Sequence, residues 1–142
     1  MRESEKGPVV LVAAKEDLLN DLKDALSNTN FLLLHAPTKQ EAIVLLERLR
    51  SEINIAIVEL ELPDFGGWDL IRQLTFLPDR PVKIIATTSI YPEPFFGKIK
   101  EIGVDAVVGK AIPNEAWRRT VLTVLETEQR KALATNKDGG EA

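Results

Sequence analysis

The sequence of 142 residues contains no cysteine, which excludes a disulfide framework, a thiolate nucleophile and a Cys-ligated metal. It also has no excess of basic charge: 18 Lys and Arg stand against 22 Asp and Glu, for a formal charge of −4. That balance argues against a nucleic-acid-binding surface. No apolar run approaches the roughly 18–20 residues that span a bilayer, and the charged start MRESEKG is unlike a signal peptide. We therefore expect a soluble, cytoplasmic protein that binds neither nucleic acid directly nor a membrane.

The length suits a single domain with a real hydrophobic core. We expect a flexible N-terminal arm over 1–7, one domain over 8–131 and a flexible C-terminal tail over 132–142, because both ends are polar and lack apolar anchors.

Short apolar runs rich in β-branched residues alternate along the chain with segments of helical periodicity. We expect strands near 9–14, 31–34, 53–60, 82–87 and 105–108. Helices should begin at Glu16, after Thr38 as N-cap, at Trp68, at Phe95 (ending near Ile102) and at Pro113. This (βα)5 pattern predicts an α/β fold, the flavodoxin-like three-layer sandwich with a five-stranded parallel sheet.

In such sheets, functional groups gather at the carboxyl ends of the strands. The polar and charged residues expected there, together with the neighbouring small ones, are Ala14, Lys15, Glu16, Glu59, Glu61, Thr87, Thr88, Ser89 and Lys110.

Three stretches in this order resemble the CheY-like receiver domains of response regulators. They are Ile55–Pro63 followed by Gly66-Gly67, Ile84–Ser89, and Gly103–Lys110, and the resemblance covers roughly residues 8–128. It implies a role in two-component, phosphorelay signal transduction. In that family an Asp accepts a phosphoryl group while an acidic pair holds Mg²⁺.

Several positions depart from the family's pattern. The phosphoacceptor position holds Glu59, and the acidic pair is replaced by Ala14 and Lys15. The conserved lysine corresponds to Lys110. The switch hydroxyl falls best on Thr88, with Thr87 second, and the aromatic partner of the switch is Val107.

These departures predict a pseudo-receiver. Without the acidic pair, Mg²⁺ binding should be lost or weak, and we expect no catalytic residue, metal or other cofactor. Lys15, Glu59 and Lys110 should instead form a metal-free ion-pair cluster that holds one fixed state, resembling the active one because Glu can imitate a phosphorylated Asp. The protein would then be no enzyme but an interaction module for a histidine kinase or a downstream signalling protein. Whether it acts as a monomer or as a homodimer is open at this point.

Alternatives remain open at this point. The chain could be a receiver that is phosphorylated through its altered site, or a flavodoxin-like protein that binds a nucleotide or flavin. Glu16, Glu59 and Glu61 could hold a divalent ion in a shifted arrangement, and Lys15 and Glu59 could be solvated charges of little consequence.

The segment from Tyr91 to Phe96 suggests a partner surface. The spacing of Phe95 to Ile99 predicts that Phe95 is buried, which would leave Phe96 and Tyr91 exposed for a partner. Elsewhere, we expect Trp68 and Trp117 to be packing residues and His35 to be structural or exposed.

Overall fold

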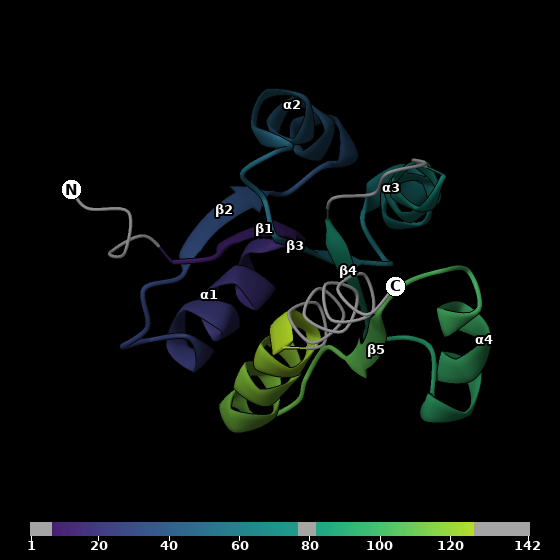
Figure 1. Ribbon diagram of the computed structural model, residues 1–142. Helices are drawn as coiled ribbons and strands as arrows, with labels where there is room; N and C mark the ends of the chain where they lie inside the picture. Colours follow the sequence, from purple (N-terminus) through teal and green to yellow (C-terminus); the bar gives the residue numbers. More distant parts are fainter. Residues whose placement is uncertain (1–6, 77–81, 127–142) are drawn as a thin grey trace, which may run out of the picture.

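The computed structural model describes residues 7–76 and 82–126, and its centre is one parallel sheet of five strands in the order β2-β1-β3-β4-β5 (Figure 1). The strands are β1 (Val9–Ala13), β2 (Leu32–Ala36), β3 (Ile55–Glu59), β4 (Lys83–Thr88) and β5 (Ala106–Gly109). The expected arm, apart from Gly7, and the expected tail over 132–142 lie outside the described residues.

Helices cover both faces of the sheet (Figure 1). They are α1 (Glu16–Ala25), α2 (Lys39–Leu49), α3 (Gly66–Thr75), α4 (Phe96–Lys100) and a last helix that is described over 114–126. The 3-10 turns Pro63–Phe65 and Glu93–Phe95 precede α3 and α4. No helix among the described residues is both long and apolar enough to cross a membrane.

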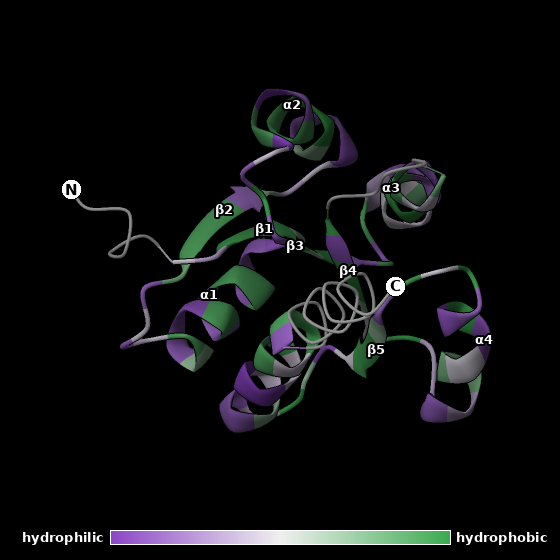
Figure 2. Ribbon diagram, viewed as in Figure 1, coloured by the Kyte–Doolittle hydropathy of each residue, from purple (hydrophilic) through white to green (hydrophobic). Residues whose placement is uncertain are grey.

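Two hydrophobic cores lie on the two faces of the sheet, because successive side chains of a strand point to opposite sides. In β3, Ala56 and Val58 face the core shared with α2, α3 and α4, whereas Ile55 and Ile57 face the core shared with α1 and the helix over 114–126. Burial on both faces explains why the three inner strands, β1, β3 and β4, read as continuous apolar runs. Figure 2 accordingly shows the strands largely in the colour of hydrophobic residues, while the helices carry both colours.

The predicted flavodoxin-like arrangement is confirmed, and the strand positions agree with the expected ones to within about two residues at most ends. Thr38 caps α2 as predicted, since its hydroxyl accepts a hydrogen bond from the Glu41 N–H at 3.2 Å.

The region before α4 is where the prediction was wrong. A helix from Phe95 to Ile102 was expected, but α4 spans only Phe96–Lys100, after a 3-10 turn that contains Pro94. Phe96, three residues before Ile99 in α4, packs against the core, whereas Phe95 is exposed. The 3-10 turn changes the helical phase, so the two phenylalanines exchange the roles that a continuous helix would give them.

Candidate functional site

Glu59, the last residue of β3, has a side chain that is 0 % exposed and bound through both oxygens. Its Oε1 accepts a hydrogen bond from the backbone N–H of Lys15 at 3.0 Å, and its Oε2 accepts one from Lys110 Nζ at 2.9 Å. The structure therefore brings together the three residues of the predicted ion-pair cluster.

The two lysines contribute in different ways. The Lys110 side chain is largely buried and contacts Glu59 directly, while Lys15 Nζ lies 3.7 Å from Glu59 Oε2 on a side chain that is 54 % exposed. Lys15 thus makes its close contact through the main chain, at the point where β1 gives way to α1. Its ammonium is half-solvated, but Glu59 is not the solvated rim charge considered as an alternative.

Asp17, in the first turn of α1, is a fourth member that sequence reasoning missed. Its Oδ2 lies 3.1 Å from Lys110 Nζ. The hydrogen bond from Lys110 holds the pKa of Asp17 below its ordinary value, against the opposing effect of desolvation. Desolvation works against the charge of Lys110 as well, but hydrogen bonds to Glu59 and Asp17 outweigh it and raise the pKa of Lys110.

The charges of this cluster cancel, since two carboxylates face two ammonium groups. A divalent cation is normally held by several oxygen ligands with net negative charge. Within residues 7–76 and 82–126, no three His, Asp or Glu side chains are grouped so that they could hold a metal. The arrangement is that of an internal ion-pair network.

Glu61 belongs to a separate network on the other side of the β3 end. Its Oε2 accepts a hydrogen bond from the Thr88 hydroxyl at 2.5 Å, and its Oε1 accepts one from the Ser89 N–H at 3.0 Å. Thr88 Oγ1 in turn accepts the N–H groups of Ile90 and Tyr91, both at 3.1 Å. This carboxylate fastens the loop after β4 to the loop after β3, and it does not converge with Glu59.

The strand register separates the two candidates for the switch hydroxyl. Glu59 pairs with Thr87 across β3 and β4, and the alternation of β4 places Thr87 on the same sheet face as Ile85 and Glu59. The Thr87 hydroxyl is buried and has no hydrogen-bond partner among the described residues. The structure thus puts Thr88, the preferred candidate, beside Glu61, and Thr87 on the side of Glu59.

Several other residues that the sequence analysis singled out are buried or half-buried and make packing contacts or hydrogen bonds within the fold. Ala14 is fully buried, and its carbonyl accepts a hydrogen bond from His35 Nε2 at 2.8 Å, which confirms a structural role for the histidine. Val107 is half-buried in β5 against the core on the α3 side. Trp117 is fully buried, as expected, and its indole N–H donates to the Lys110 carbonyl at 3.3 Å. Trp68 is only half-buried, with its ring edge-on to Tyr91 at a centroid distance of 5.8 Å.

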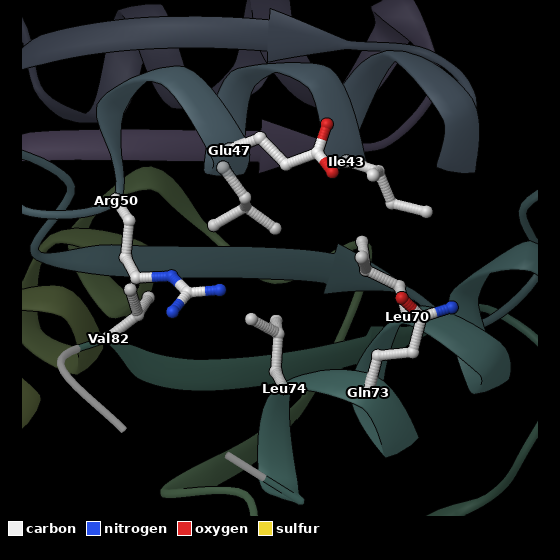
Figure 3. A pocket seen from close by; sticks show the side chains of 8 residues that line it. Ile43, Glu47, Arg50, Leu70, Gln73, Leu74 and Val82 are labelled. Carbon is white, nitrogen blue, oxygen red and sulfur yellow. The ribbon is translucent and has the colours of Figure 1, made fainter. Parts of the chain in front are cut away.

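A cavity lies between α2 and α3 (Figure 3). Its position near Arg50, which follows α2, and Val82, which precedes β4, puts it toward the amino ends of the strands. Apolar side chains form most of its lining, and Glu47, Arg50 and Gln73 add the polar groups. Binding sites of open parallel sheets lie at the opposite, carboxyl end, so we assign the functional site to the surroundings of Glu59.

Comparisons with known proteins bear on the fold. No protein-family model and no curated protein matches the chain. Among solved structures, it is similar to the signal receiver domain of a protein described as a Luxo repressor, from Vibrio parahaemolyticus, with 22% sequence identity and a TM-score of 0.77 over 91% of this chain and 97% of that one. A CheY-like response regulator receiver domain protein from Methanospirillum hungatei JF-1 is 20% identical, with a TM-score of 0.73 over 89% and 98% of the two chains.

This chain has the CheY-like receiver fold. A third structure of this fold, the Mn²⁺-bound form of the response regulator Rcp1, is 15% identical, with a TM-score of 0.66 over 83% of this chain and 91% of that one. At these identities the likeness establishes the fold, and the function has to be argued from the site of this chain itself.

Proposed function

We propose that this protein is an atypical receiver domain of two-component signal transduction, a pseudo-receiver that acts as a protein-interaction module without being phosphorylated. One observation carries the proposal: both oxygens of the buried Glu59 carboxylate are bound by groups of the protein itself, the Lys15 N–H and the Lys110 ammonium. In this proposal the protein is not an enzyme, and its partner is a histidine kinase or a downstream signalling protein in the cytoplasm.

Phosphoryl transfer to a carboxylate needs an accessible oxygen and a cation that neutralises the phosphoryl group. The Glu59 side chain is 0 % exposed and each of its oxygens is already bound by a group of the protein, and the positions of the acidic pair hold Ala14 and Lys15. An incoming Mg²⁺ would lie close to two ammonium groups, and like charges a few ångströms apart repel. The proposal therefore includes no metal cofactor.

The same contacts support a single fixed state. Glutamate is one methylene longer than aspartate, so the negative charge of Glu59 lies further from the strand and reaches Lys110 at 2.9 Å. A phosphoryl group on an aspartate would also carry negative charge outward from the strand. The proposed fixed state is therefore the active-like one, without a phosphoryl group.

The test is incubation with acetyl phosphate and Mg²⁺, followed by intact-mass measurement. The wild-type protein should gain no phosphoryl adduct, and its tryptophan fluorescence should not respond to Mg²⁺. A labile adduct that maps to Glu59 would overturn the proposal in favour of a phosphorylated receiver with a non-standard site. An absorbance spectrum of the purified protein addresses the flavin-binding alternative, which requires a bound chromophore.

A matched variant shows whether the altered residues are responsible. Lys15→Asp combined with Glu59→Asp restores one acid of the metal pair and the family's phosphoacceptor, and Lys15 is exposed enough to be replaced without disturbing the core. This double variant should bind Mg²⁺ and gain a Mg²⁺-dependent adduct at residue 59. Circular dichroism establishes that both proteins are folded under the conditions of the assay.

A further inference from the structure

An exposed apolar groove lies between the loop after β3 (residues 60–65) and the loop after β4 (residues 89–92). Its volume is about 490 Å³, which is within the size range of sites that receive ligands or side chains. Phe65, Trp68, Ile90 and Tyr91 line it. Phe65 is 78 % exposed, and Ile90 and Tyr91 are exposed as well. Neighbouring exposed apolar side chains on a small protein indicate an interaction surface.

Hydrogen bonds and ring contacts hold this groove in shape. The Glu61 carboxylate binds Thr88, and Thr88 Oγ1 accepts the N–H groups of Ile90 and Tyr91. The Tyr91 ring is edge-on to Trp68, at 5.8 Å between centroids. A surface that is already ordered loses little entropy when a partner binds.

The backbone presents Phe65 to solvent. Asp64 and Phe65 both have φ of 57°, the left-handed conformation that non-glycine residues rarely adopt. Such conformations cost energy and persist only where the surrounding structure imposes them. Here the result is an aromatic ring at the mouth of the groove rather than in the core.

The charge of the groove selects its partner. Glu61 and Asp64 are the charged residues that line it, and among the described lining residues none is basic. A second copy of this chain, docked through the same groove, would set these carboxylates against each other. A segment that carries an apolar side chain next to Lys or Arg complements both the apolar lining and the negative charge.

We propose that this groove binds a basic amphipathic segment of a protein partner, with an apolar side chain between Phe65 and Tyr91 and a Lys or Arg beside Asp64. The inference rests on the proposed interaction role and adds the place and chemistry of the partner.

Two synthetic peptides of equal length test it, an amphipathic leucine–lysine helix and its leucine–glutamate counterpart. Titrated into the labelled full-length protein, the leucine–lysine peptide should shift the amide resonances of residues 60–68 and 88–91, and the leucine–glutamate peptide should not. Fluorescence anisotropy of the labelled peptide gives the affinity.

Matched variants locate the binding. Phe65→Asn, which tolerates the left-handed conformation, should weaken the leucine–lysine peptide by about tenfold. Phe76→Asn is the control, because Phe76 is 79 % exposed at the opposite end of α3. Asp64→Asn should weaken binding by about threefold, whereas the remote Glu115→Gln should have no effect. Ile90→Ser provides a second apolar variant in case Phe65→Asn is not folded.

Equal binding of both peptides, shifts that map outside the groove, or an affinity unchanged by both Phe65→Asn and Ile90→Ser would each overturn the inference. A concentration-dependent dimer that Phe65→Asn abolishes would identify a second copy as the occupant and would overturn it too. The phosphorylation assay on Glu59 does not involve the groove, so failure of the peptide test and failure of the proposed function can be told apart.

Discussion

Replacement of Glu59 by Gln removes one negative charge from the centre of the cluster and keeps the size of the side chain. The amide retains one acceptor for two donors, so at least one of the hydrogen bonds from Lys15 and Lys110 is lost. A hydrogen bond to a charged group contributes roughly 1.5–3 kcal/mol, and an orphaned buried charge costs about 3–5 kcal/mol. Because Asp17 stays 3.1 Å from Lys110, we expect the free energy of unfolding to fall by about 2–3 kcal/mol.

Urea denaturation followed by circular dichroism and tryptophan fluorescence measures this loss. Glu115→Gln is the control: the Glu115 side chain is 83 % exposed and pairs with Arg119 at 3.4 Å on the surface, so its loss should stay within about 0.5 kcal/mol. The control separates the buried cluster from a general effect of removing one negative charge.

A double-mutant cycle with Lys110→Met tests the coupling itself. If Glu59 and Lys110 stabilise the fold through each other, the decreases in the free energy of unfolding of the two single variants should add up to more than the decrease of the double variant. The expected difference is about 1 kcal/mol or more. A Glu59→Gln variant within about 0.5 kcal/mol of wild type would refute the reasoning, because it would mean that the buried carboxylate contributes nothing through its two lysine contacts.

Three further predictions concern the same end of the sheet and the helices beside it. Although desolvation opposes it, hydrogen bonding to two carboxylates raises the pKa of Lys110 above its ordinary 10.5, so its contribution to stability is complete below that pH and is lost as pH rises through the folded-state pKa. Between about pH 9 and about pH 11.5, the free energy of unfolding measured by urea denaturation should therefore decrease more for the wild type than for Lys110→Met. Gly67→Ala should cost about 3 kcal/mol or more, since a Cβ there would lie 2.1 Å from a backbone oxygen at the end of β3; Gly97→Ala, with no atom within 4 Å, should be neutral or more stable by up to about 1 kcal/mol in the same denaturation assay. Thr88→Val removes the hydroxyl that binds Glu61 and two backbone N–H groups, so hydrogen exchange in the loop after β4 should become faster, and unchanged exchange would contradict the fastening role of that hydroxyl.

Local patterns in the sequence were sufficient for most of the fold. The β-branched apolar runs specified strands that are buried on both faces, and the apolar spacing of α1 specified its buried side. The order of these elements then placed Lys15, Glu59 and Lys110 at one edge of the sheet, because parallel strands end on the same side. The stretches that resemble receiver domains predicted the same placement of Glu59 and Lys110.

The sequence by itself thus determined the alternation of strands and helices and the set of residues at the carboxyl edge, since both follow from periods of two and 3.6 residues. Only the tertiary structure decided which of these residues touch. Asp17 forms an ion pair with Lys110, which lies 93 positions later in the chain. The Thr88 hydroxyl donates a hydrogen bond to Glu61 and not to Glu59. Phe96 packs against the core, where Phe95 was expected. Such contacts depend on strand register and side-chain rotamers, which are set by packing between distant segments, and on the 3-10 turn at Pro94, which interrupts the helical period.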